Sequence, residues 1–143
     1  MKRHSSHRDD GVSAKKHLGQ HFLKDPAISQ RIAGLVTGEM TTTILEVGPG
    51  TGALTRPLLS RFDKAVHVIE IDRESVAYLK SSDWIEPNRG HEGDLLRCTP
   101  ESLGLQGSFS IVGNFPYNIS SQILFRVLDW RHRVPECVGM FQK

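Results

Sequence analysis

Residues 44–53 read Ile-Leu-Glu-Val-Gly-Pro-Gly-Thr-Gly-Ala, a short apolar run followed by three glycines at alternate positions. The apolar run is typical of a buried strand, and the glycines permit a sharp turn and a close approach of backbone to a ligand. Leucines at helical spacing follow over residues 53–62. The stretch predicts a strand, a tight turn and a helix. It fits the relaxed dinucleotide-binding pattern G-x-G-x-x-G/A, whereas no Gly-Lys-Ser/Thr follows to make a phosphate-binding P-loop.

The alternation of strand and helix continues along the chain. Apolar patterns predict strands at 44–47, 65–71, 108–113 and 134–141, with a weaker one before Gly93, and helices at 28–36, 53–62, 73–81 and 119–130. Such alternation predicts an α/β fold, in which a parallel sheet is covered by helices on both faces. In sheets of this kind ligands bind beyond the carboxyl ends of the strands.

Acidic residues follow two of these strands. Glu70 ends the second strand, where its carboxylate can accept hydrogen bonds from ribose hydroxyls. Asp72 lies just beyond and better suits the start of the next helix. Asp94, after the third strand, could accept from the amino group of an adenine. The alternatives are a helix-terminal acid for Glu70 and an ordinary Gly-Asp turn for Asp94.

The most specific pattern is Asn114-Phe115-Pro116-Tyr117, after the fourth predicted strand. An aromatic amino nitrogen is a poor nucleophile because its lone pair is delocalised into the ring. Hydrogen bonds to the Asn114 side-chain oxygen and the Phe115 carbonyl would favour a pyramidal nitrogen. Pro116 stiffens the turn, and Tyr117 offers a face for an unstacked base. The alternative is an Asn-x-Pro loop with a core tyrosine.

Composition sets limits on function. The chain has 143 residues, enough for one domain, with a formal net charge of +2 and a pI of about 8.7, which permits a nucleic-acid partner without proving one. Residues 1–14 are expected to form a disordered basic tail or an arm that touches RNA phosphates. No apolar stretch is long enough to span a membrane, and no secretory signal is present.

A metal site is not expected. Cys98 and Cys137 lie far apart and match no metal or redox spacing, so we expect idle thiols in a reducing cytoplasm. His17 and His21 are four residues apart, but no third ligand accompanies them.

Several motifs together resemble the ribosomal RNA adenine dimethyltransferases, which are related to the erythromycin-resistance rRNA methylases. The resemblance covers residues 15–143, and its motifs are Leu18-Gly19-Gln20-His21-Phe22-Leu23, Glu46-Val47-Gly48-Pro49-Gly50-Thr51-Gly52, Glu70-Ile71-Asp72, Gly93-Asp94 and Asn114-Phe115-Pro116-Tyr117-Asn118-Ile119-Ser120. It implies a Rossmann-like fold that binds S-adenosylmethionine (SAM) and dimethylates adenines of small-subunit ribosomal RNA in the cytoplasm.

The resemblance also implies site roles. SAM would be bound by six residues together with the catalytic asparagine, namely His21, Leu23, Gly48, Gly50, Glu70, Asp94 and Asn114. Asn114 and Tyr117 would form the methyl-transfer centre.

Family members continue past residue 143 with further strands and a C-terminal helical domain. We therefore expect residues 15–143 to be an N-terminal SAM-binding domain whose sheet is incomplete at its C-terminal edge. The last strand would lie at an open edge and favour association. The alternative functions are a non-catalytic rRNA-binding assembly factor, or an NAD-dependent oxidoreductase favoured by the glycine turn and Glu70.

Overall fold

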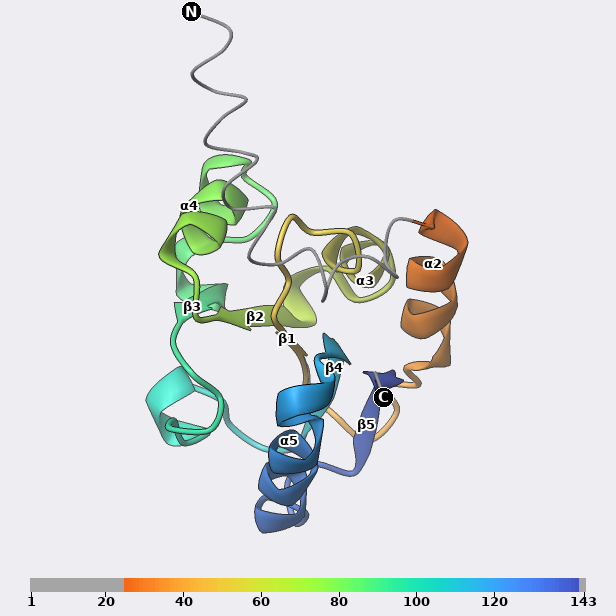
Figure 1. Ribbon diagram of the computed structural model, residues 1–143, viewed down its shortest axis with the longest axis vertical. Coiled ribbons are helices and arrows are strands. Elements are labelled where there is room, and N and C mark those ends of the chain that lie inside the picture. The colour runs from red at the N-terminus through yellow and green to blue at the C-terminus, as the bar shows by residue number, and fades with distance from the viewer. Residues whose placement is uncertain (1–24, 142–143) are drawn as a thin grey trace, which may run out of the picture.

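The computed structural model describes residues 25–141, which form a five-stranded parallel sheet with helices on both faces (Figure 1). The strands are β1 (Thr43–Val47), β2 (Val66–Glu70), β3 (Gly90–Glu92), β4 (Phe109–Phe115) and β5 (Glu136–Phe141). The helices are α2 (Pro26–Leu35), α3 (Thr55–Phe62), α4 (Arg73–Ser81) and α5 (Tyr117–Asp129), with 3-10 turns η2 (Asp63–Ala65), η3 (Pro87–Arg89) and η4 (Glu101–Leu103).

The strand order is β3-β2-β1-β4-β5. The chain moves outward from β1 to β3, then returns to the other side of β1, so that the order reverses between β1 and β4. This is the arrangement of the Rossmann-like fold, in which ligands bind at the reversal. The predicted α/β class and helices on both faces are confirmed.

Two apolar layers hold the sheet between its helices. On one face, Ile44, Val68 and Val112 pack against α2, α3 and α4. On the other face, Leu45 and Ile111 and their neighbours pack against α5 and η4. Figure 1 shows α5 on the opposite side of the sheet from α2 and α3. Burial on both faces explains why apolar residues stand at consecutive positions, Ile44-Leu45 in β1 and Ile111-Val112 in β4, rather than alternating with polar ones.

Side-chain hydrogen bonds to backbone groups stabilise the ends of α2 and α4. Asp25 caps α2 by accepting from the Ala27 amide at 2.9 Å. Asp72 caps α4 by accepting from the amide and the hydroxyl of Ser75, at 3.0 and 2.8 Å. The helix-terminal role predicted for Asp72 is therefore confirmed. Arg61 donates to the carbonyls of Ala33 and Val36 and so closes the end of α2 against α3.

Several predicted boundaries differ from the observed ones by one or two residues, and one of these differences bears on the site. The sequence predicts that the fourth strand ends at Gly113, with Asn114 and Phe115 in the turn that follows. The structure includes both residues in β4, because the pairing with β5 continues to the partners Phe115 and Phe141. Among residues 25–141, no helix is both long and apolar enough to cross a bilayer.

Two histidines form a hydrogen-bonded pair at the β3 edge of the sheet. Nδ1 of His67 lies 3.1 Å from Nε2 of His91, with the ring planes 10° apart. Burial lowers the pKa of His67 to about 4, helped by His91 and Arg89. Burial and Lys80 also lower the pKa of His91. Both rings are therefore neutral at pH 7.

We expect this pair to destabilise the fold in mild acid. A histidine whose pKa is lower in the folded state binds fewer protons there than when unfolded, so stability falls as pH drops from about 6.5 to about 4. Because the ring is only half-buried, solvent screening limits the loss to about 1–2 kcal/mol. Urea unfolding at pH 5 and 7.5 should show a smaller loss for His67→Gln than for wild type. Equal losses in both proteins would contradict this assignment.

Candidate functional site

The glycine turn between β1 and α3 uses a backbone conformation that favours glycine. Gly48, Gly50 and Gly52 have φ values of 70°, 56° and 95°. The Gly48 amide donates to the carbonyl of Ile69 on β2 at 2.9 Å, which fixes the start of the turn to the neighbouring strand. The predicted turn is thus present at the carboxyl end of β1.

Gly52 has a second constraint from packing. A Cβ atom at this position would collide with the Trp84 ring and approach Leu79 at 3.3 Å. The Trp84 ring is held in turn by the Arg56 guanidinium, 4.3 Å from the ring centroid. The third glycine is therefore required by the close packing of the α3 entry on the segment after α4.

We expect Gly52→Ala to destabilise the protein by about 2–3 kcal/mol, from backbone strain plus overpacking. Gly48→Ala is the matched control, because it carries the same kind of φ but nothing lies within 4 Å of its Cβ. The control should lose only the strain contribution, about 1 kcal/mol. Chemical denaturation measures both, and equal losses would show that the Trp84 contact is unimportant.

Glu70 lies at the end of β2, as predicted, and its carboxylate braces the glycine turn. One oxygen accepts from the Gly50 amide at 3.1 Å and the other from the Asp72 amide at 3.0 Å. The side chain is buried, with 8% of its surface exposed. The carboxylate therefore fixes the glycine turn to the end of β2.

Glu46 is a second acid beneath the turn, and sequence reasoning did not assign it a role. It lies within β1 with 1% of its surface exposed and accepts from the Thr55 hydroxyl of α3 at 2.5 Å. Burial raises the pKa of Glu46 to about 8, with a further increase from Glu70 and an opposing effect of the Thr55 bond. Glu46 is neutral at pH 7. The only signal in the sequence was an acid inside an apolar strand.

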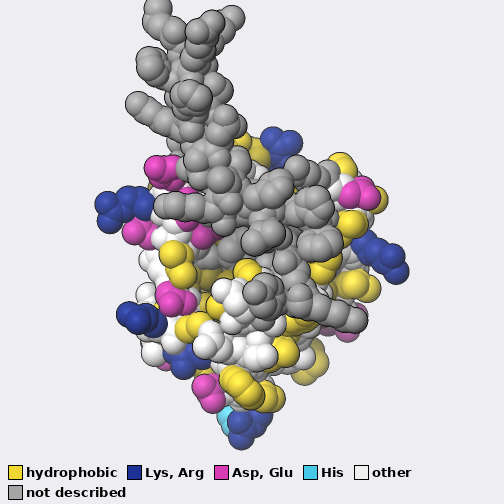
Figure 2. All heavy atoms as spheres, viewed as in Figure 1, with side chains coloured by type: hydrophobic (Ala, Val, Ile, Leu, Met, Phe, Trp, Pro, Cys, Tyr) yellow, Lys and Arg dark blue, Asp and Glu magenta, His cyan; other side chains and the backbone are white. Residues whose placement is uncertain are grey.

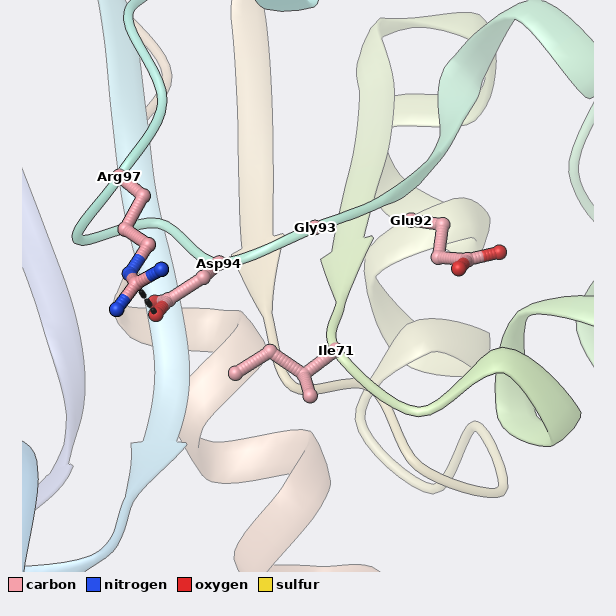
Figure 3. Close-up of a pocket in the computed structure, with 5 residues that line it drawn as sticks. All are labelled: Ile71, Glu92, Gly93, Asp94 and Arg97. Atoms are coloured by element: carbon pink, nitrogen blue, oxygen red, sulfur yellow. Dashed lines mark ion pairs between the residues drawn. The ribbon is translucent and has the colours of Figure 1, made fainter.

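A cleft of about 340 Å³ opens beside the ends of β2 and β3, near the lower end of the ~300–1,000 Å³ typical of ligand pockets. Its lining residues are Ile71, Glu92, Gly93, Asp94 and Arg97. Ile71, 65% exposed, and Asp94 point into the same space, whereas Glu92 points away (Figure 3). An exposed apolar side chain beside a carboxylate can bind a flat ring that carries an amino group.

Asp94 is positioned by its own loop. Its Oδ1 accepts from the Leu96 amide at 3.0 Å, and its Oδ2 lies 4.0 Å from Arg97 Nε. The preceding Gly93 amide donates to the Glu70 carbonyl at 2.9 Å. This bond joins the predicted Asp94 position directly to the Glu70 position.

Asn114 belongs to the same edge of the sheet. It is the next-to-last residue of β4, one residue beyond Gly113, which is the register partner of Val47 at the end of β1. Pro116 caps α5 with φ −61° and ψ 146°, and Tyr117 is the first helical residue. The carboxyl ends of β1, β2, β3 and β4 thus bring the predicted residues Gly48, Gly50, Glu70, Asp94 and Asn114 to one edge. His21 and Leu23 lie outside the described residues, as does the basic tail.

Three other kinds of functional feature could lie within residues 25–141: metal-binding clusters, charged patches and reactive thiols. No group of three or more His, Cys, Asp or Glu side chains there could hold a metal ion. On the face shown in Figure 2, Lys and Arg side chains are interspersed with Asp and Glu. The thiols are unsuited to nucleophilic chemistry, because burial raises the pKa of Cys98 and brings the pKa of Cys137 to about 11.

The chain is similar in sequence to known ribosomal RNA methyltransferases. A sequence model of the family described as "Ribosomal RNA adenine dimethylase" matches residues 11–143. The chain is 48% identical over 134 residues to a ribosomal RNA small subunit methyltransferase A of Flavobacterium johnsoniae, covering 92% of this chain and 50% of that protein. The chain therefore spans about half the length of the relatives it matches.

Two solved structures are similar as well. A dimethyladenosine transferase from Plasmodium falciparum has a TM-score of 0.63 at 31% identity, covering 83% of this chain and 42% of that one. The 23S rRNA methyltransferase ErmE has a TM-score of 0.59 at 30% identity, covering 77% and 43%.

Proposed function

This chain belongs to the ribosomal RNA adenine dimethylase family, and from that premise we propose that it binds SAM at the carboxyl ends of β1–β4 and methylates adenine amino groups of small-subunit ribosomal RNA. The observation that carries the proposal is the joining of four motifs at one sheet edge. The Gly50 amide donates to the Glu70 side chain and the Gly93 amide donates to the Glu70 carbonyl. These bonds connect the glycine turn, the acid proposed to bind the ribose and the cleft.

In this proposal each part of the edge would bind one part of the cofactor. Gly48 and Gly50 would line the methionine end, where side chains would obstruct the backbone approach. Glu70 would accept from the ribose hydroxyls. Asp94 would accept from the adenine amino group, with Ile71 against the ring face. His21 and Leu23 would complete the site from the N-terminal segment.

The reaction would be a direct displacement. When bound, SAM would supply an activated methyl group: the adenine amino nitrogen would form the new N–C bond as the S–C bond breaks, and S-adenosylhomocysteine would leave. The protein contributes positioning and electrostatics. Asn114 would accept a hydrogen bond from the amino group through its side-chain oxygen, and the Phe115 carbonyl would accept the other. Tyr117 would support the target base. The surplus proton is acidic after transfer, so no strong general base is required.

The proposed partner is small-subunit ribosomal RNA, within a pre-ribosomal particle of the cytoplasm. The alternatives are a non-catalytic RNA-binding assembly factor and an NAD-dependent oxidoreductase, and each has its own test. An assembly factor would bind RNA without transferring methyl groups from labelled SAM. An oxidoreductase would bind NADH in preference to S-adenosylhomocysteine. Calorimetric titration with both ligands distinguishes an oxidoreductase from a methyltransferase.

We expect Glu70→Ala to weaken SAM binding about 10- to 150-fold, from the loss of roughly 1.5–3 kcal/mol of charge-assisted hydrogen bonding. Glu92→Ala is the matched control, since this carboxylate lines the same cleft but points away from it (Figure 3). The control should bind within about twofold of wild type. Calorimetry measures both, and wild-type affinity in the Glu70 variant would remove that residue from the ribose position.

A further inference from the structure

The Phe115 ring packs over a pair of glycines in the sheet. Gly113 on β4 and Gly139 on β5 are register partners, and both lie beneath the ring. A Cβ at Gly113 would stand 2.8 Å from the ring, and one at Gly139 would stand 2.5 Å from it. The Phe141 ring packs beside it with 4.9 Å between centroids. Phe115 is completely buried.

We propose that Gly113 and Gly139 form a seat for the Phe115 ring, and that this seat sets the position of the Asn114 side chain at the methyl-transfer centre. The two glycines are then positioning residues for the reaction. The inference rests on the proposed function, because it assigns them a role through Asn114.

Phe115 is the last residue of β4, and Pro116, which follows it, offers no amide to continue a ladder. A strand end of this kind needs another anchor. Successive side chains alternate between faces, so the ring of Phe115 packs on the α5 side while Asn114 leaves on the opposite side. Fixing the ring therefore fixes the backbone rotation that aims Asn114.

The seat has no room for adjustment. Besides the ring, a Cβ at Gly113 would stand 2.8 Å from the Val47 carbonyl oxygen, and one at Gly139 would collide with the Gly113 carbonyl oxygen. These contacts are with backbone atoms of β1 and β4, which cannot move aside as a flexible side chain would. A methyl group at either position must therefore shift the ring, the strand or both. Methyl transfer is sensitive to such shifts, because a misplacement of about 1 Å can cost roughly 100-fold in rate.

The test is a double-mutant cycle in the full-length protein. Gly139→Ala and Phe115→Leu each disturb the seat, and the second does so without a backbone collision, which keeps the test valid if Gly139→Ala fails to fold. Each is combined with Asn114→Ala. Calorimetry with S-adenosylhomocysteine gives the affinity, and incorporation of labelled methyl into small-subunit RNA gives the rate. Val138→Ala is the control, since it weakens β5 from the opposite face of the sheet.

We expect each seat variant to lose about 10- to 100-fold in methyl-transfer rate while cofactor affinity changes by less than about fivefold. Added to Asn114→Ala, either should cause little further loss of rate, because both act through the same side chain. Val138→Ala should keep the wild-type rate at a reduced melting temperature. Wild-type rates in the folded seat variants, or losses that multiply with that of Asn114→Ala, would overturn the seat alone. Absence of cofactor binding in wild type would overturn the proposed function as well.

Discussion

Replacing Glu46 with glutamine should destabilise the protein near pH 4.5 and stabilise it above pH 8. Glu46 lies beneath the glycine turn with 1% of its surface exposed, and burial raises its pKa to about 8. In the unfolded chain the same carboxyl ionises near its ordinary pKa of 4.5. Between these two values the unfolded chain has released a proton that the folded protein still binds. The free energy of unfolding therefore decreases as pH rises through this window, and the loss is complete above the folded pKa.

The magnitude follows from the width of the window. A separation of several pKa units corresponds to a cost on the order of 4 kcal/mol at pH 8 and above. Glutamine has no such ionisation, but its buried amide group adds a pH-independent cost of roughly 1–3 kcal/mol. The variant should therefore begin below wild type at acidic pH, reach equal stability within the window, and exceed it at alkaline pH.

Denaturant unfolding of both proteins at pH 4.5, 6, 7 and 8.5 measures this crossing. Glu136→Gln is the control. Amide and hydroxyl donors of Thr37, Gly38 and Ser110 bind the Glu136 carboxylate and lower its pKa, against the effect of burial. Its contribution is lost only as pH falls below the ordinary value, so that variant should run parallel to wild type from pH 5 to 8.5. A constant difference between Glu46→Gln and wild type would mean that Glu46 is ionised in the fold.

The strands and helices were predictable because their signals are local. β1 and its glycine turn follow from ten consecutive residues, and the helix-terminal role of Asp72 follows from the three residues after it. Where the prediction failed, the cause is distant in sequence. β4 extends through Asn114 and Phe115 because β5 pairs with it there. The sequence around residue 114 contains no signal that predicts this pairing. The 3-10 turns were not predicted because each is only three residues long, too short to show a periodic pattern.

The site likewise has features that could be predicted from local sequence and features that could not. Strand-end positions place Glu70, Asp94 and Asn114 at one edge of any parallel sheet with this order, so their proximity was predictable. The bonds between them were not, since the Gly50 amide reaches Glu70 only after β2 pairs with β1. The role of Glu46 was not predicted because it depends on burial and on a hydrogen bond from Thr55, which α3 positions beside it.

Asn114→Ala should reduce methyl transfer by about 100-fold or more in the full-length protein while leaving the fold intact. The predicted role of Asn114 requires an acceptor at the end of β4, the strand that adjoins β1 and its glycine turn. Without that acceptor the adenine nitrogen keeps its lone pair in the ring and attacks the methyl group poorly. The loss should appear mainly in the rate of transfer, because the acceptor acts on the substrate amino group as it reacts.

Single-turnover assays with labelled methyl measure this rate, and thermal unfolding checks the fold. Asn118→Ala is the matched control, since this exposed asparagine belongs to the same motif but is the second residue of α5. It should retain the wild-type rate, because an exposed amide on the helix surface has no place at a strand end. If Asn114→Ala kept its turnover within two- or threefold of wild type, the acceptor would have to be another group, and the Phe115 carbonyl would be the next to consider. If both variants lost activity together, α5 rather than the end of β4 would be the element that controls transfer.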